Sequence, residues 1–183
     1  MADRDGVAAA QGQRLVVRAS PGARSRGTLW FGPLAVACAL GRSGIARRKR
    51  EGDGATPAGR FELVSVYYRA DRGRRPVTGL PVEPIAPADG WCDDPAHPRY
   101  NRPVELPFAA SHERMWRDDP LYDIVVVLDY NLFPAVRGRG SALFFHIARP
   151  GYTPTEGCVA VTPRDMRLIL ARVRPGAVME IVG

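Results

Sequence analysis

Two short apolar runs late in the chain, residues 142–147 and 159–161, are separated by a loop rich in proline and glycine. Apolar runs of this length bounded by turn residues are typical of strands, so the loop is predicted to return the chain to the first strand. His146 lies near the end of the first run, and Cys158 comes immediately before the second. The pattern therefore predicts a β-rich region in which an imidazole and a thiol meet.

A thiol beside an imidazole is the minimal device for nucleophilic catalysis, because the thiolate attacks and a neighbouring imidazole favours its formation. Gly157 lacks a side chain, so the N–H groups of Glu156, Gly157 and Cys158 could turn towards one substrate oxygen as an oxyanion hole. The same residues also fit a packed free cysteine and a hydrogen-bonded core histidine. The residues alone leave both interpretations open.

The segment resembles the active-site signature of the L,D-transpeptidase catalytic domain (YkuD-like) family, a histidine followed by a loop and a Ser/Thr-His-Gly-Cys run. His146, Thr155, Gly157 and Cys158 match that signature. The run Thr-Pro-Ala-Gly-Arg-Phe at 56–61 resembles a Thr-Pro-x-Gly-x-Phe run that lies upstream in the same family. Alone it would be a weak turn signal, and its order relative to the histidine and cysteine gives it weight.

The resemblance implies a mostly β (β-rich α+β) fold of mixed sheets or a sandwich, with one helix near the C-terminus. It implies a peptidoglycan L,D-transpeptidase that serves cell-wall biogenesis and cell shape, in which Cys158 forms a thioester with a stem peptide. His146 would act as the base, and no metal or other cofactor is expected. The alternatives are an L,D-carboxypeptidase or amidase hydrolase on the same scaffold, and a non-catalytic basic binding module. Candidate substrate-binding residues are Arg149, Tyr152, Thr155 and Trp91.

Two positions depart from the family pattern. Glu156 stands where the family usually has a second histidine, and Ala160 where it often has arginine or asparagine. A carboxylate beside the nucleophile would disfavour the thiolate unless a cation offsets it. Arg149 is the nearest arginine in sequence, so we predict a Glu156–Arg149 pair, with a solvent-exposed Glu156 as the alternative.

Length and composition predict one domain. The chain has 183 residues, 45% of them hydrophobic, which is enough for a sizeable core over residues 13–183. Residues 1–12 are small and polar and are expected to form a flexible tail without the apolar stretch of a secretory signal. The family resemblance implies a periplasmic or cell-wall location, whereas the absence of a visible signal peptide leaves the cytoplasm as the alternative.

The net charge of +7 favours anionic partners, and the sharpest basic cluster is residues 47–50, Arg-Arg-Lys-Arg. No nucleic-acid-binding motif accompanies the charge, so stem peptides are the expected partner and nucleic acid is not. No apolar run approaches the length of a membrane span, so stable membrane insertion is not expected. No feature of the sequence defines an oligomeric state.

The three cysteines have no paired spacing, which argues against a disulfide scaffold and against a zinc site. Cys38 lies in an apolar run and is predicted to be packed, whereas Cys92 lies in a polar stretch. Cys158 is therefore the candidate nucleophile.

Apolar periodicity and turn residues predict most elements of the chain. Residues 61–68 alternate as a half-buried edge strand would, and 163–174 form a helix capped by Thr162 and ended by Pro175 and Gly176. The irregular stretch 70–120 is predicted to be an elaborated loop that walls a site, with its aromatic residues lining the site or anchoring the loop. The other predicted strands are 13–18, 28–31, 34–40, 123–128, 142–147, 159–161 and 177–182.

Overall fold

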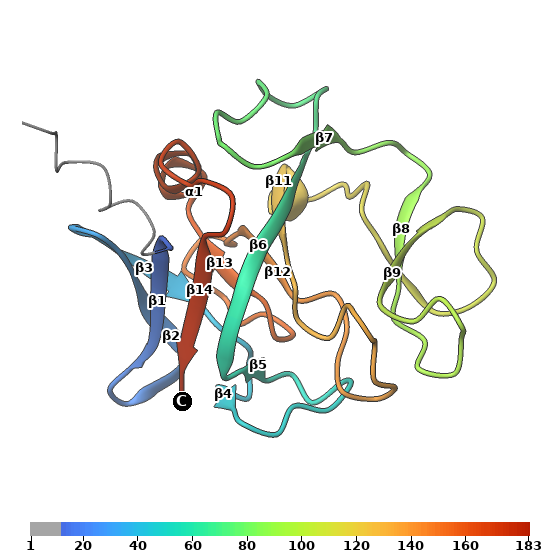
Figure 1. The fold of residues 1–183 in the computed structure, drawn as a ribbon, viewed down its shortest axis with the longest axis horizontal. Coiled ribbons are helices and arrows are strands. Elements are labelled where there is room, and N and C mark those ends of the chain that lie inside the picture. Colours follow the sequence, from blue (N-terminus) through green and yellow to red (C-terminus); the bar gives the residue numbers. More distant parts are fainter. Residues whose placement is uncertain (1–11) are drawn as a thin grey trace, which may run out of the picture.

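The computed structural model describes residues 12–183, so the predicted tail lies outside the described residues except for Gly12. A nine-stranded sheet dominates the fold, and β6 also pairs with β11, which closes eight of the nine strands into a ring with β7 outside (Figure 1). One α-helix packs against it. The prediction of a β-rich fold with a single helix near the C-terminus is confirmed. The strands, in sheet order, are β11 (Ile124–Leu128), β12 (Phe144–Ile147), β13 (Val159–Val161), β3 (Leu34–Ala39), β2 (Ala23–Phe31), β1 (Arg14–Ser20), β14 (Val178–Val182), β6 (Gly59–Tyr68) and β7 (Val82–Pro84).

Strand β11 separates two hydrophobic cores. Its Ile-Val-Val-Val-Leu sequence is buried throughout, as expected of β-branched residues covered on both faces. Ile124, Val126 and Leu128 belong to the main core, whereas Val125 and Val127 belong to a second core on the other face. The second core underlies the candidate site.

Strand β6 was predicted at an edge, and that prediction is wrong. Its first residues pair with β14, and its later residues pair with β7 and β11. Its alternating burial arises because only one face meets the main core, with Leu63 and Val66 buried and Glu62 exposed. Alternation reports which faces are covered and not whether a strand has neighbours.

Helix α1 (Pro163–Leu170) begins as predicted and ends earlier than predicted. Thr162 caps it by accepting the N–H of Asp165 at 3.1 Å, and Pro163 occupies the first turn. Met166, Ile169 and Leu170 pack into the main core. After Leu170 the chain forms turns that still bury Val173, so the apolar stripe continues after the helix has ended. Among residues 12–183 no helix has the length and apolar character needed to cross a bilayer.

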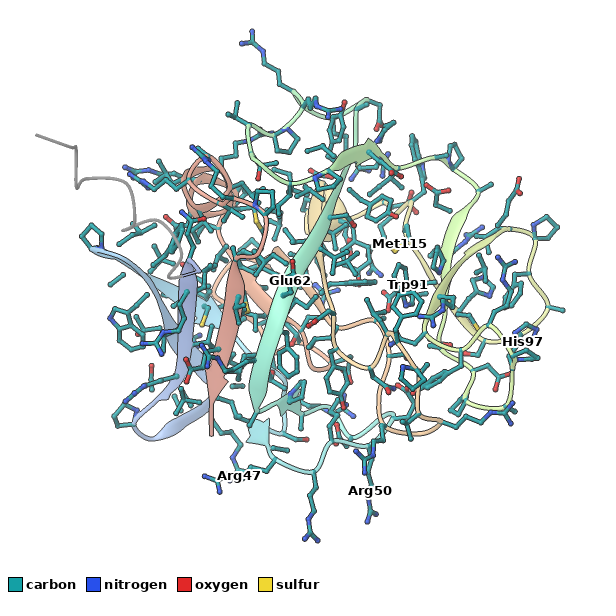
Figure 2. All side chains as sticks on the ribbon, in the orientation of Figure 1. Arg47, Arg50, Glu62, Trp91, His97 and Met115 are labelled. Atoms are coloured by element: carbon teal, nitrogen blue, oxygen red, sulfur yellow. The ribbon has the colours of Figure 1, made fainter. Side chains whose placement is uncertain are left out.

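The stretch predicted as an elaborated loop contains a second, three-stranded sheet. Its order is β10 (His112–Arg114), β8 (Asp89–Cys92) and β9 (Arg102–Glu105), and it lies beside the main sheet (Figure 1). Trp91 and Met115 fill the second core between the two sheets (Figure 2). Cys92, assigned to a polar stretch, is buried in β8 and free. A short 3-10 helix (Pro120–Tyr122) leads from this region into β11.

Arg69, which directly follows β6, joins the main sheet to the segment after β10. The side chain is 4% exposed, and it donates to both carboxylate oxygens of Asp71 and to the carbonyl of Arg117. Its guanidinium also lies 3.6 Å from the ring centroid of Trp116. The remaining pair of strands, β4 (Ile45–Ala46) and β5 (Thr56–Pro57), holds the two ends of the loop that carries the basic cluster.

Candidate active site

His146 is held on β12 by its own backbone neighbour. The side chain is 4% exposed, and its Nδ1 lies 2.9 Å from the carbonyl oxygen of Ile147. Because a carbonyl only accepts, Nδ1 must carry the proton, which leaves Nε2 as an acceptor. The ring of Tyr122 packs edge-on against the imidazole, with centroids 5.4 Å apart. These contacts fix both the tautomer and the orientation of the ring.

Cys158 immediately precedes β13, the parallel neighbour of β12. Phe145 pairs with Val159 and His146 with Ala160, so Cys158 stands opposite Phe144. Residues two apart on a strand share a face, and the Cys158 and His146 Cα atoms are therefore diagonal neighbours at about 8 Å. The half-buried thiol donates to the Ala142 carbonyl at 3.3 Å and accepts the Phe144 N–H at 3.4 Å.

The turn before the cysteine is built on Thr155 and Gly157. The Thr155 hydroxyl donates to the carbonyl of Cys158 at 2.7 Å and accepts the N–H of Gly157 at 3.2 Å. Gly157 has φ of 141°, and a Cβ there would lie 2.8 Å from the carbonyl oxygen of Ala55. Within residues 12–183, the N–H groups of Glu156 and Cys158 have no acceptor, while that of Gly157 is already engaged.

Both groups face a cavity of about 380 Å³. Six of the eight residues predicted for the site line it: His146, Arg149, Thr155, Glu156, Gly157 and Cys158. The structure does not bring the other two, Trp91 and Tyr152, into the lining. Tyr152 is half-buried with φ of 54°, and its pKa is raised by burial and by the nearby Asp165 and Cys38.

Trp91 supports the site from behind. Its ring is 5% exposed and packs edge-on against Phe144, and its Nε1–H donates to the Asn101 side-chain oxygen at 2.9 Å. That oxygen also accepts the N–H of Ala142 at 3.0 Å, and the Ala142 carbonyl accepts the thiol of Cys158. The sequence left two roles for this residue, lining the site or anchoring the loop. The structure shows that Trp91 anchors the loop.

Asn101 connects the second sheet to the loop before β12, and the sequence analysis did not identify it. The residue is fully buried with φ of 57°, and its amide nitrogen donates to the carbonyls of Tyr130 and Asn131. With the two bonds to its oxygen, every hydrogen-bonding position of the amide is used. Asparagine tolerates the left-handed conformation, and a Tyr-Asn pair inside an irregular stretch is the one signal that could have marked it.

Burial determines the charge state of the nucleophile. The pKa of the Cys158 thiol is raised to about 12, chiefly by burial and to a smaller extent by the carboxylate of Glu113. The Phe144 N–H and the cation of Lys49 act in the opposite direction and do not overcome burial. Lys49 is held beneath the cavity by Asp53, with which it forms an ion pair.

Burial also lowers the pKa of His146 to about 4, assisted by the cations of Arg117 and Arg149 and opposed by the Ile147 carbonyl and Asp119. At neutral pH the resting site therefore holds a neutral thiol and a neutral imidazole. The expectation that the imidazole favours a resting thiolate is not met. For each group, burial removes more hydration free energy from the charged form than the neighbouring charges and hydrogen bonds restore.

A charged network lies on the second sheet's side of the cavity. Arg117 donates to both oxygens of Asp119 at 2.8 Å and to Glu113 at 3.1 Å. Tyr122 donates its hydroxyl to Glu113 at 3.0 Å. Burial raises the pKa of Glu113, with Tyr122 and Arg117 opposing that rise. Sequence analysis missed this network because its members lie in short strands and turns without a recognisable motif.

The predicted Glu156–Arg149 pair is not formed. Glu156 is paired with Arg42, and Arg149 approaches Asp119 at 3.5 Å. Arg42 is brought there by backbone pairing, since its N–H donates to the carbonyl of Thr155 at 2.9 Å. The Glu156 side chain is also 79% exposed, as the alternative predicted, and the cation beside it comes from a distant part of the sequence. Among residues 12–183 no three histidine, cysteine or acidic side chains are grouped to hold a metal ion.

The fold and the cavity define a β-rich protein that presents one thiol and one imidazole, from adjacent parallel strands, to a common pocket. The chain belongs to the L,D-transpeptidase catalytic domain family (YkuD), whose match covers residues 11–181. This confirms the family resemblance seen in the His-Cys segment and the upstream Thr-Pro run.

Among solved structures, the chain is similar to the crystal structure of Mycobacterium tuberculosis L,D-transpeptidase 1, with 15% identity and a TM-score of 0.39. The alignment covers 94% of this chain and 63% of that chain, so this chain spans less than two thirds of that protein. No curated protein matches the chain.

Proposed function

We propose that this protein is a cysteine-dependent L,D-transpeptidase that transfers acyl groups between peptidoglycan stem peptides at the cell wall. The observation that carries the proposal is that Cys158 and a carbonyl-tethered His146 line one cavity, in a chain of this family. We further propose that residues 13–183 act as one catalytic unit, which agrees with the ring of strands that joins β1 to β14.

In the first step His146 Nε2 takes the thiol proton as the Cys158 sulfur attacks a stem-peptide carbonyl. The sulfur–carbon bond forms, the carbon–nitrogen bond breaks, and the departing amine takes the proton from the imidazolium. The free N–H groups of Cys158 and Glu156 are the proposed donors to the developing oxyanion. A general base must be unprotonated before the reaction, and the low pKa of His146 keeps the imidazole unprotonated at neutral pH.

In the second step an acceptor amine attacks the thioester. His146 takes a proton from that amine, the new carbon–nitrogen bond forms, and the sulfur–carbon bond breaks with return of the proton to the thiolate. Water in place of the amine would give a hydrolase instead. Arg149 and Thr155 remain our proposed substrate contacts, because both line the cavity. Trp91 and Tyr152 do not line it, so any effect on substrate would be indirect.

The test is incubation with a purified disaccharide tetrapeptide, followed by mass spectrometry of both protein and products. We expect an acyl adduct on Cys158 and cross-linked dimers, and neither with Cys158→Ala. Trimmed monomers without dimers would instead identify the hydrolase. Equal activity of Cys158→Ala and the wild type would contradict the proposal. So would a folded wild-type protein that forms no acyl adduct on Cys158 with any stem peptide tested.

A further inference from the structure

A second hollow opens beside the catalytic cavity and is lined largely by arginine. It has a volume of about 770 Å³ and shares Lys49 and Tyr130 with the cavity. Its cationic lining comes from two loops, the basic cluster between β4 and β5 and the turn before β12. We call it the arginine groove and define it by Arg47, Arg48, Arg50, Arg137 and Arg139.

The arginines of the groove have no ion-pair partner among the described residues. Within residues 12–183, no carboxylate lines the groove either. Two acids lie in the same loop as the basic cluster and point elsewhere: Asp53 pairs with Lys49 and accepts two backbone N–H groups, and Glu51 accepts the hydroxyls of Tyr100 and Ser141. Arg50 extends away from the body of the protein (Figure 2), whereas the Arg47 guanidinium donates to the carbonyl oxygen of Gly183 at 3.1 Å. Five like charges held together repel one another, and a bound anion would relieve that repulsion.

The groove lacks what a nucleic acid would need. Tyr130 is its only aromatic lining residue among those described, and that ring packs edge-on against Phe61 with centroids 5.3 Å apart. The Tyr130 hydroxyl donates to the Arg139 carbonyl, which fixes the ring further. A base therefore finds no free ring to stack on. Guanidinium groups match carboxylates and phosphates through paired hydrogen bonds, and of these two anions the stem peptides of the proposed substrate carry carboxylates.

We infer that the arginine groove binds carboxylate groups of a peptide chain that belongs to the same polymeric substrate whose reacting peptide occupies the catalytic cavity. This rests on the proposed function, and the shared Lys49 and Tyr130 place the two hollows side by side, where one extended substrate could reach both. The groove would hold the polymer while the cavity selects the reacting bond. Polymeric substrates then bind more tightly than isolated peptides of the same sequence.

The direct test measures binding of a fluorescent poly-L-glutamate peptide at low and high salt. We expect Arg137→Gln/Arg139→Gln and Arg47→Gln/Arg48→Gln each to weaken binding roughly tenfold, by loss of two exposed ion pairs. Binding by the wild type should also weaken as salt screens the groove. The matched control is Arg74→Gln/Arg75→Gln, which removes the same charge from exposed residues outside both hollows and should bind as the wild type does. Thermal melting confirms that each variant is folded.

Equal losses in the control and the groove variants, or no loss in either, would overturn the inference. So would binding of inorganic polyphosphate or phosphatidylglycerol vesicles through the groove without binding of poly-L-glutamate. On the enzyme, the groove variants should lower the ratio of turnover on intact sacculi to turnover on a soluble tetrapeptide. Poly-L-glutamate binding does not require Cys158, so retained binding by a wild type that forms no acyl adduct would refute the proposed function and leave groove binding established.

Discussion

The structure predicts an unusually unreactive resting thiol. The pKa of Cys158 is raised from 9.0 to about 12, which lowers the thiolate fraction at neutral pH about a thousandfold. A more basic thiolate is the better nucleophile, with a slope of about 0.4–0.5, and over about three pKa units this recovers about fifteen- to thirtyfold. Reaction with a disulfide probe should therefore be about thirty- to sixtyfold slower than that of an exposed cysteine at the same pH.

The assay follows release of thiopyridone from 4,4′-dithiodipyridine between pH 6 and pH 10, values chosen to lie about the ordinary thiol pKa. The rate for Cys158 should rise about tenfold per pH unit without a plateau, because the thiol pKa lies above the whole range. Cys158→Ala gives the background from the two buried thiols, Cys38 and Cys92. A plateau below pH 8 would refute the reasoning, since it would identify a resting thiolate–imidazolium pair.

Two charge variants test whether neighbouring charges contribute to the raised pKa of Cys158. Glu113→Gln removes a carboxylate that raises the thiol pKa, so the rate profile should move to lower pH. Lys49→Met removes the opposing cation, and the profile should move to higher pH. Glu62→Gln, an exposed acid on β6, is the matched control and should leave it in place. Shifts in the same direction for Glu113→Gln and Lys49→Met would show that charge is not the cause.

Three further substitutions test the scaffold of the site. Gly157→Ala should destabilise the turn by about 1–3 kcal/mol and abolish acylation, because its Cβ would meet the Ala55 carbonyl; normal melting and an unchanged acyl adduct would contradict this. Asn101→Asp loses both donors to buried carbonyls and should lower the free energy of unfolding by about 2–4 kcal/mol in urea titration, whereas a neutral result would mean that the connection is dispensable. Cys38→Ala should cost about 1–2 kcal/mol and leave acylation intact, and an unchanged melting temperature would exclude a packing role.

Sequence reasoning succeeded where one local pattern determines the structure. The short β-branched run of β11 indicates a strand covered on both faces, and Thr162 with Pro163 marks a helix start without tertiary information. The strand that carries His146 and the strand that follows Cys158 were placed by the apolar runs around a Pro-Gly loop. In each case neighbouring residues contain the whole signal.

Sequence reasoning failed where the structure depends on a contact with residues far away in the sequence. Strands β8 to β10 are three or four residues long and contain glycine, proline and charged residues, so they show no periodicity that would separate them from a loop. Glu156 was assigned to the arginine nearest in sequence, whereas backbone pairing delivers Arg42. The raised thiol pKa likewise depends on burial by several elements, and no single segment encodes it.

The position of β14 in the ring has a consequence for the order of folding. β14 lies between β1 and β6, pairing in parallel with the first and antiparallel with the second. During synthesis the ring therefore stays open between these two strands until residues 178–182 have left the ribosome. Contacts between strands so far apart in sequence close slowly, because the chain entropy of a long loop must be lost first. Until then the hydrogen-bonding edges of β1 and β6 are both unpaired on that side, so the nascent chain is most exposed to strand-mediated aggregation just before its last strand is made.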